Sequence, residues 1–372
     1  MRVLIAPDKF KGCLTAEEVA KQIAAGIHDV MPAAQIDLMP VADGGDGTAE
    51  VICRALNGTW ITCRANDPLG RIIECRYAFI KDQRLAVIEM SEAAGMRRLS
   101  PAERDPLRAT TFGVGQLILD AARRGAGKII VGLGGSATND GGFGMARAFG
   151  FRFFDGEGMQ VRASVNKLRT LKRIDPPSNV ALPPIVGAFD VQNVLLGKEG
   201  ATHVFGPQKG AAGANLVLLE KCMERLARVA SRQVRRADPK QPGAGAAGGL
   251  GFGLMVFTGA TLRSGFQVVS EIIETEKRLK AADIVITGEG KLDSQTLSGK
   301  APAGIARLAR QNGKRVFAVV GRADHHGHGE ELFDKVYQLS TGANDEAASI
   351  AKASELLRER SREMAKSWTA KP

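Results

Sequence analysis

The chain has 372 residues, of which 44% are hydrophobic and 24% charged, and this suits a folded protein of two domains rather than a disordered one. Aromatic residues make up only 5%, and much of the net charge of +11 comes from dispersed basic pairs, which favours solvated helix faces first, an anionic substrate second and nucleic acid last. Five cysteines without a C-x-x-C pair predict reduced thiols in the cytoplasm, and no apolar stretch suits a signal peptide or a membrane span.

Alternating strand and helix patterns open the chain. They predict strands at 2–6 and 36–41 and helices at 16–30 and 48–56. Thr15 and Glu18 have the spacing of a capping box at the start of the first helix. Strands that alternate with helices are typical of a parallel α/β sheet.

The pattern changes at about Thr59. Strands at 59–64, 71–80 and 85–89 follow one another without long helices between them, which predicts a different, mixed sheet. The elements expected further along are helices at 111–124, 142–149 and 215–234, strands at 128–131, 151–154 and 185–189, and a glycine-rich loop at 242–253 that leads into a helical segment at 254–259.

The first pattern returns after Lys280. The elements expected there are strands at 283–287, 315–320 and 336–339 and helices at 302–311 and 346–366. Two strands at the start of the chain and three at its end would form one parallel sheet, with the middle of the chain as an insertion. We therefore predict an α/β protein with a discontinuous domain at 1–60 plus 281–372 and an inserted mixed α/β domain at 61–280.

Five loops combine glycine with acidic or small polar residues, and each follows a predicted strand. They are loop 1 (residues 6–12), loop 2 (43–48), loop 3 (132–142), loop 4 (189–193) and loop 5 (287–295). In parallel α/β sheets, ligands bind at the loops beyond the carboxyl ends of the strands.

The residue types in these loops suit phosphoryl transfer. Glycine loops before helices offer N–H groups to phosphate oxygens, carboxylates hold Mg²⁺, and cations neutralise developing charge. Ser136, Thr138 and Asn139 make loop 3 the candidate phosphate cradle. The candidate carboxylates are Asp43, Asp46, Asp190, Glu289 and Asp293, and the candidate cations are Lys9, Lys11, Lys209 and Lys300.

Each feature also has a purely structural interpretation. Asp-Gly pairs form ordinary turns, Asn139 and Asp140 can cap the following helix, and the lysines can lie on the surface. Five such loops between strand and helix patterns exceed what turn formation requires.

Other classes of site account for the sequence less well. Residues 132–137 fit G-x-G-x-x-A, and Asp155 closes the next predicted strand, which would suit a dinucleotide-dependent dehydrogenase. This match leaves the other four loops unexplained. No G-x-x-x-x-G-K-[ST] or G-x-S-x-G motif occurs, and the histidine cluster on a polar loop, at His325, His326 and His328, is more typical of solvated side chains than of a metal site.

Taken together and in this order, the loops resemble those of the type I glycerate kinase family. The matching stretches are APDKFKGCLTAEE (6–18), PVADGGDGT (40–48), GLGGSATNDGG (132–142), FGPQKGA (205–211), PGAGAAGGLGFG (242–253) and VITGEGKLDSQTLSGK (285–300). One departure is Asn193-Val194-Leu195, where the family is expected to have Asn-Pro-Leu, and the missing proline should loosen a turn near Asp190.

The resemblance implies a fold and an activity. The fold would have two α/β domains, one of them Rossmann-like with a parallel three-layer arrangement and interrupted by the other, with the active site in the cleft between them. The activity would be transfer of the γ-phosphate of ATP, with Mg²⁺, to D-glycerate, giving 2-phosphoglycerate. Alternatives that stay open are a glycerate 3-kinase that forms 3-phosphoglycerate, a nicotinamide-dependent hydroxy-acid oxidoreductase and a noncatalytic small-anion binder.

With this resemblance, the candidate residues take hypothetical roles. Catalytic roles go to Asp190 or Asp293, which would orient the hydroxyl, and to Lys11 or Lys209, which would bind the glycerate carboxylate or the phosphoryl group. The nucleotide-binding candidates are Gly134, Gly135, Ser136, Thr138, Asn139, Gly248, Gly249 and Glu289, and the Mg²⁺ candidates are Asp43, Asp46, Asp190 and Asp293. We expect a cytoplasmic monomer or homodimer that binds neither nucleic acid nor a membrane.

Overall fold

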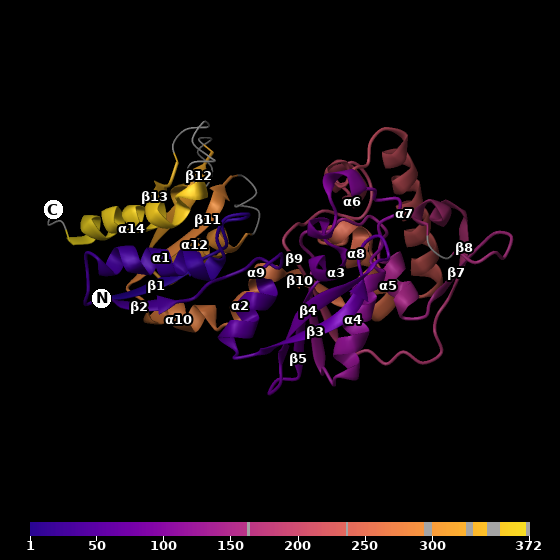
Figure 1. The fold of residues 1–372 in the computed structure, drawn as a ribbon, viewed down its shortest axis with the longest axis horizontal. Coiled ribbons are helices and arrows are strands. Elements are labelled where there is room, and N and C mark those ends of the chain that lie inside the picture. Colours follow the sequence, from indigo (N-terminus) through magenta and orange to yellow (C-terminus); the bar gives the residue numbers. More distant parts are fainter. Residues whose placement is uncertain (162–163, 236, 294–299, 325–329, 341–349, 370–372) are drawn as a thin grey trace. The chain divides into compact units, whose positions relative to one another are not determined.

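The computed structural model describes residues 1–161, 164–235, 237–293, 300–324, 330–340 and 350–369, and the chain divides into two compact units (Figure 1). Unit 1 consists of Met1–Asp43 and Phe266–Pro372, and unit 2 is Gly44–Gly265. The chain therefore leaves unit 1 and returns to it. Both divisions lie earlier in the chain than the boundaries after residues 60 and 280 that the sequence suggests.

Unit 1 is built on a five-stranded sheet whose pairings are all parallel, in the order β13-β12-β11-β1-β2. The strands are β1 (Arg2–Pro7), β2 (Gln35–Leu38), β11 (Ile284–Leu292), β12 (Arg315–Ala323) and β13 (Lys335–Gln338). Central strand β1 is buried over nearly its whole length, as expected for a strand covered on both faces. The predicted single sheet of two early and three late strands is confirmed.

Helices cover both faces of this sheet. They are α1 (Ala16–His28), α9 (Gly265–Ile272), α10 (Thr275–Ala281), α12 (Ala301–Gln311) and α14 (Ala353–Thr369), with a 3₁₀ turn at Glu330–Leu332. Helices α1 and α14 share one hydrophobic cluster with β1, β11 and β12, and α12 contacts the same strands without belonging to that cluster. The predicted capping box is confirmed, because the Thr15 amide donates to Glu18 Oε2 at 2.8 Å and the Glu18 amide donates to Thr15 Oγ1 at 3.2 Å.

Unit 2 contains a six-stranded mixed sheet in the order β10-β9-β6-β5-β4-β3. The strands are β3 (Thr59–Asn66), β4 (Ile72–Ile80), β5 (Leu85–Glu89), β6 (Lys128–Gly132), β9 (Ile185–Phe189) and β10 (Thr261–Ser264). Strands β3, β4 and β5 pair antiparallel, whereas β5, β6, β9 and β10 pair parallel. The predicted mixed sheet is therefore confirmed. Strands β7 (Arg152–Asp155) and β8 (Leu171–Asp175) form a separate antiparallel pair.

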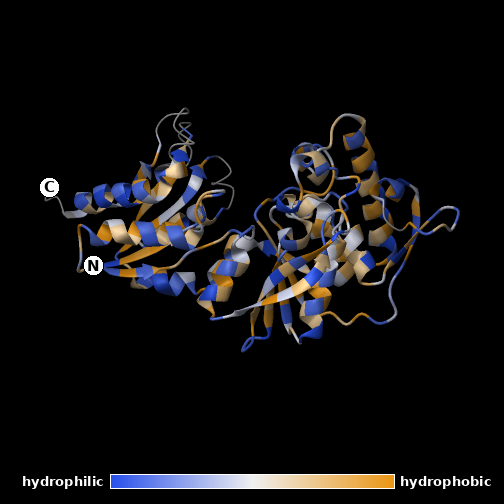
Figure 2. Ribbon diagram, in the orientation of Figure 1, coloured by the Kyte–Doolittle hydropathy of each residue, from blue (hydrophilic) through white to orange (hydrophobic). Residues whose placement is uncertain are grey.

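The helices of unit 2 pack around the main sheet, and most of them contribute to one large hydrophobic core. They are α2 (Thr48–Ala55), α3 (Ser91–Ala94), α4 (Phe112–Arg123), α5 (Phe143–Ala148), α6 (Ala201–Phe205), α7 (Ala214–Gln233) and α8 (Ala246–Thr258), with 3₁₀ turns at Met96–Arg98, Pro101–Glu103, Val165–Thr170 and Pro207–Lys209. Much of helix α14 in unit 1 is hydrophilic (Figure 2). Among the described residues, no helix has both the length and the apolar character needed to cross a membrane.

Three sequence expectations need correction or fall outside the description. The glycine-rich loop predicted at 242–253 is confirmed as far as Gly249 and is wrong from Leu250 to Gly253. Although α8 spans Ala246–Thr258, Ala247, Gly248 and Gly249 have non-helical backbone angles with positive φ, and the regular helix starts after them. The strand predicted to end at residue 287 continues to Leu292 in β11. Residues 346–349 of the predicted terminal helix, 294–295 of loop 5, and His325, His326 and His328 lie outside the described residues.

Candidate active site

In unit 1, several acidic side chains gather at the carboxyl ends of neighbouring parallel strands. Asp8 directly follows β1, and its amide donates to the carbonyl of Gly288 in β11 at 2.8 Å. Glu289 is the next residue of β11, and Asp43 lies in the segment after β2. All three acidic side chains are buried. The parallel register thus brings Asp43 and Glu289, which the sequence singles out, together with Asp8, which it does not.

Burial alters the acidity of this group. The pKa of Asp8 is raised from 3.8 to about 7, first by burial, then by the negative charge of Asp43, with a smaller contribution from Glu289. Lys9 opposes the shift through its charge and its backbone hydrogen bond. The sequence signal for Asp8 was available, since an acidic residue directly after a buried strand stands where parallel sheets bind ligands.

Lysines lie at the edge of this acidic group. Lys300 Nζ is 3.7 Å from Glu289 Oε2 and 3.8 Å from Asp293 Oδ1. Lys291 Nζ is 3.8 Å from Asp293 Oδ2. The exposed residue Lys11 follows β1 in loop 1, whose backbone lies beside Gly290 of β11. Unit 1 therefore presents carboxylates flanked by lysines at one end of its sheet.

The donor set of unit 1 fits a magnesium ion that arrives with a nucleotide. Among the described residues, no three histidine, cysteine or acidic side chains converge closely enough to hold a metal by themselves. Mg²⁺ commonly uses one or two protein carboxylates and takes its other ligands from substrate phosphates and water. Of the predicted magnesium ligands, Asp43 belongs to this buried group, and its carboxylate is of the right kind for such a shared site.

In unit 2, loop 2 and loop 3 pack backbone against backbone through glycines. A Cβ on Gly134 would lie 2.4 Å from Gly45 Cα, and a Cβ on Gly132 would lie 2.8 Å from the Gly44 carbonyl oxygen. A Cβ on Gly135, which has φ +69°, would lie 2.9 Å from Asp46 Oδ1. Only glycine permits such close backbone contacts, so loop 3 packs tightly against residues 44–46 of loop 2.

Loop 3 is fastened at its far end by a buried carboxylate. Asp140 accepts hydrogen bonds from the amides of Thr111, Gly142 and Gly144 at 2.9 to 3.1 Å, and from the hydroxyl of Thr111. Burial raises the pKa of Asp140, and these hydrogen bonds act against the shift. Asp140 therefore caps α5, as the structural interpretation of the sequence allows, and also ties loop 3 to the start of α4.

Lys209 lies behind loop 3. Its side chain is 2% exposed, and Nζ donates to the Thr138 carbonyl oxygen at 2.8 Å. Burial lowers the pKa of Lys209 to about 7, opposed by the charge of Asp140. Thr138 Oγ1 and Asn139 Oδ1 are buried and have no hydrogen-bond partner among the described residues. These two oxygen atoms could therefore still form hydrogen bonds, and they lie in the loop that the sequence assigns to phosphate binding.

Gly248 and Gly249 also lie behind loop 3. Both have positive φ, as does Ala247, and a Cβ on Gly248 would lie 1.9 Å from the Thr138 carbonyl oxygen. A Cβ on Gly249 would lie 3.0 Å from Gly141 Cα. The left-handed turn at the start of α8 therefore brings its backbone directly against loop 3, which accounts for the glycine pattern without a ligand.

Asp190 stands half-buried at the carboxyl end of β9, the strand beside β6 and loop 3. The turn after it is held without the proline expected there, because Asn193 Nδ2 donates to the Glu199 carbonyl oxygen at 2.8 Å and the Gly245 amide donates to the Asn193 carbonyl oxygen at 3.0 Å. Ser136 and Asn139 thus follow β6 and Asp190 follows the adjacent strand β9, while Asp46 of loop 2 packs against Gly135 of loop 3.

The whole chain also matches known proteins. A model of the glycerate kinase family covers residues 3–369. The chain belongs to the glycerate kinase family.

Similar members of the glycerate kinase family include a glycerate kinase of Halalkalibacterium halodurans, 41% identical over 86% of this chain and 85% of the relative, and the glycerate 2-kinase of Escherichia coli, 40% identical over 93% of both chains. A crystal structure assigned to a glycerate kinase 2 of Salmonella typhimurium LT2 matches with a TM-score of 0.86 and 39% identity, covering 99% of this chain and 98% of that one.

Membership of the glycerate kinase family makes the protein an enzyme, a phosphotransferase, and sets aside the oxidoreductase and the noncatalytic binder. The position of Asp155 also argues against a dinucleotide-binding site, because this residue ends β7 in the separate two-stranded sheet. A ribose-binding acid belongs at the end of a strand in the same parallel sheet as the glycine loop.

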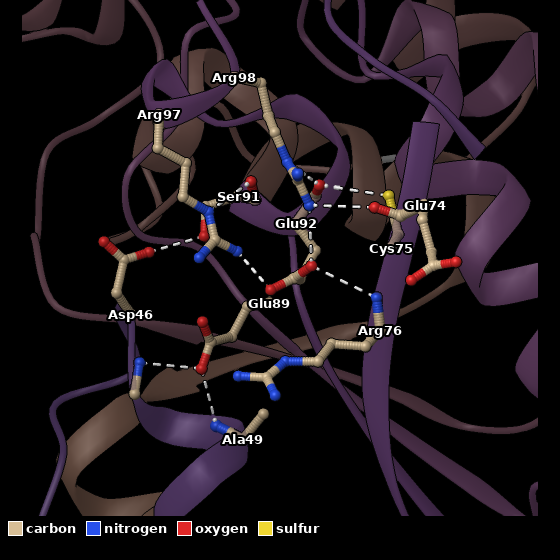
Figure 3. A network of polar contacts seen from close by, with 11 residues as sticks. Asp46, Ala49, Glu74, Cys75, Arg76, Glu89, Ser91, Glu92, Arg97 and Arg98 are labelled. Atoms are coloured by element: carbon tan, nitrogen blue, oxygen red, sulfur yellow. Dashed lines mark hydrogen bonds and ion pairs between the residues drawn. The ribbon is translucent and has the colours of Figure 1, made fainter. Parts of the chain in front are cut away.

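Sequence reasoning missed three further residues beside loop 2. Glu89 ends β5, and Ser91 and Glu92 follow it. Glu89 accepts hydrogen bonds at the start of α2, Ser91 donates to Asp46, and Glu92 forms an ion pair with Arg97 (Figure 3). The partners of Glu89 and Ser91 lie about forty residues away in the chain, and no local motif marks them.

Proposed function

We propose that the protein transfers the γ-phosphoryl group of ATP to D-glycerate and forms 2-phosphoglycerate. The observation that carries the proposal is the match of the family model to residues 3–369, together with a relative named glycerate 2-kinase that is 40% identical over 93% of the chain. The packed glycine loops of unit 2 and the buried carboxylates of unit 1 supply the groups that such a reaction needs.

In this proposal, loop 3 binds the phosphates of ATP. Its backbone N–H groups and the side chains of Ser136, Thr138 and Asn139 meet the phosphate oxygens, which would satisfy the buried Thr138 Oγ1. Lys209 then holds the loop from behind through the Thr138 carbonyl, or turns its ammonium group to the transferring phosphoryl group. Gly248 and Gly249 support the loop rather than contact the nucleotide.

Some of the carboxylates would bind the metal, and others would orient the hydroxyl group of glycerate. Magnesium, when bound, would be held by members of the set Asp43, Asp46, Asp190 and Asp293, and it would neutralise the phosphate charge. Asp190 or Asp293 would accept a hydrogen bond from the hydroxyl at C2 of glycerate, and Lys11 would pair with the glycerate carboxylate. Glu289, beside Lys300, would fix the end of β11.

The first test is glycerate-dependent release of ADP from MgATP by the purified protein. We expect ADP release with D-glycerate, little release without it, and loss of activity when EDTA removes Mg²⁺, with recovery when Mg²⁺ is added in excess. ADP release that does not depend on glycerate would contradict the assigned acceptor, and activity that persists in EDTA would contradict the metal.

We also propose that the protein works in the cytoplasm as a monomer or homodimer, without nucleic-acid or membrane partners. All five cysteines are free thiols, which supports a reducing compartment. Size-exclusion chromatography with light scattering would distinguish the two assemblies, and a larger particle would contradict both.

A further inference from the structure

The segment that follows β5 connects loop 2 to loop 3 within unit 2. The N-cap residue of helix α2 is Gly47, which has φ 91° and no side chain to cap the helix. Glu89, the last residue of β5, supplies the cap instead, because its Oε1 accepts hydrogen bonds from the amides of Gly47 and Ala49, both at 2.9 Å. Glu89 is 9% exposed, so this cap is shielded from water.

The next polar residue of the segment holds a candidate metal ligand. Ser91 Oγ donates to Asp46 Oδ1 at 2.6 Å, and Ser91 is 1% exposed. On its other side, Asp46 lies against Gly135 of loop 3, where a Cβ would be 2.9 Å from Asp46 Oδ1 and 3.2 Å from Ser91 Cβ. The carboxylate of Asp46 is therefore fixed between Ser91 and the phosphate loop.

The same segment holds loop 3 through its backbone. The Met96 amide donates to the Gly135 carbonyl oxygen and the Ala137 amide donates to the Ala94 carbonyl oxygen, both at 2.9 Å. These bonds flank a β-bridge between Gly95 and Ser136. One short stretch of chain thus contacts both loops, and it sets the position of Asp46 relative to the phosphate-binding backbone.

Glu92 keeps this stretch rigid. Its carboxylate forms ion pairs with Arg97 at 2.5 Å and Arg98 at 3.0 Å, and it accepts a hydrogen bond from the Arg76 amide of β4 at 3.3 Å (Figure 3). A cavity of about 100 Å³ opens beside the network and is lined in part by Asp46, Glu89, Glu92 and Arg97. Asp46 therefore borders open space while its orientation is fixed from behind.

We propose that Ser91 and Glu89 are positioning residues for phosphoryl transfer, Ser91 by orienting the carboxylate of Asp46 and Glu89 by fixing the start of α2 that follows it. This inference rests on the proposed function. Neither residue needs to touch ATP or glycerate, because each acts through loop 2. Loss of either should slow turnover more than it weakens the binding of substrates.

The test compares Ser91→Ala with Ser100→Ala. Ser100 is a matched control, because its Oγ also donates to a carboxylate, Glu103 Oε2 at 3.0 Å, but on the exposed surface away from both loops. We expect Ser91→Ala to lower kcat at least tenfold with less than a threefold change in KM for glycerate, and Ser100→Ala to match the wild type. Ser91→Cys, which fills a similar space with a weak donor, should show the same loss if the alanine variant folds poorly.

A double-mutant cycle shows whether Ser91 acts through Asp46. We expect Asp46→Ala to lower kcat strongly and Ser91→Ala to cost little more in that background. Equal losses in both backgrounds would overturn the role of Ser91. Glu89→Gln keeps one acceptor oxygen and should retain more activity than Glu89→Ala, so equal activities in these two variants would overturn the role of Glu89.

Amide hydrogen exchange adds a readout that does not require turnover. We expect faster exchange at residues 46–49 in Glu89→Ala and at 134–137 in Ser91→Ala, with Ser100→Ala unchanged. An active wild type with fully active Ser91 and Glu89 variants overturns the positioning role alone. A wild type that does not phosphorylate glycerate overturns the proposed function, and the positioning role with it.

Discussion

At the scale of single residues, the site combines carboxylates whose surroundings differ widely. Asp190 is half-buried at the end of β9, whereas Asp293 follows β11 and lies within 3.8 Å of two lysines. Asp8 is buried beside Asp43. These differences suggest separate tasks, since burial beside another carboxylate raises the pKa of Asp8 and pushes it toward its neutral form.

Asp190 and Asp293 are the residues whose catalytic role is most easily tested. We expect Asp190→Asn or Asp293→Asn to reduce kcat by roughly 10²- to 10⁴-fold, the usual worth of a group that orients or deprotonates a nucleophile. The melting temperature should fall far less than the turnover, because both carboxylates are only half-buried. Steady-state kinetics and thermal melts check this, and unchanged turnover in both variants would remove them from the mechanism.

The raised pKa of Asp8 predicts how the free energy of unfolding depends on pH. Its pKa is about 7 in the folded protein against an ordinary 3.8, so the folded state binds a proton that the unfolded chain has released between these values. Asp8 should therefore lower the free energy of unfolding as pH rises from about 4 to about 7, by on the order of 4 kcal/mol in total.

Denaturant unfolding at several pH values checks this. Asp8→Asn should flatten the decline in stability across the window, whereas Asp82→Asn, at an exposed turn, should leave it unchanged. An Asp8→Asn variant that loses stability with pH as steeply as the wild type would show that Asp8 is not buried in its acidic form.

At the scale of elements, strands and helix caps with regular sequence patterns could be predicted, but the close packing of glycine-rich backbone could not. Strands β5 and β9 and the capping box of α1 follow from local sequence and match the structure. The loop predicted at 242–253 extends too far, because Leu250–Gly253 are helical after the left-handed turn at Ala247–Gly249, and the low helix propensity of glycine masks this buried part of α8. The roles of Glu89 and Ser91 depend on contacts across about forty residues, which no local pattern contains.

The packing of α8 against loop 3 leads to a matched pair of variants. Gly248 and Gly158 both have positive φ, at 65° and 78°, but only Gly248 faces nearby atoms. An alanine at either position should cost about 1 kcal/mol of backbone strain. Gly248→Ala should cost roughly 1–3 kcal/mol more, because its Cβ would meet the Thr138 carbonyl. Equal destabilisation in chemical unfolding would mean that α8 does not support loop 3 as described.

At the scale of the whole molecule, each unit carries part of the predicted chemistry. Unit 1 holds Asp8, Asp43, Glu289 and Asp293 at the end of a parallel sheet, and unit 2 holds loop 3 with Asp46 and Asp190. The sheet of unit 1, whose strands come from both ends of the chain, and the mixed sheet of unit 2 were predictable from the spacing of strand and helix patterns. The sequence could not predict which loops bind the nucleotide and which bind the substrate, because both ligands require the same kinds of residue: glycines, carboxylates and lysines.

The most direct test of the central claim is the phosphorus NMR spectrum of the product formed from MgATP and D-glycerate. The account predicts a new resonance that matches authentic 2-phosphoglycerate and grows in step with ADP. A resonance of 3-phosphoglycerate would keep the phosphotransferase and contradict the assigned hydroxyl, and the absence of any phosphoglycerate would contradict glycerate as the acceptor.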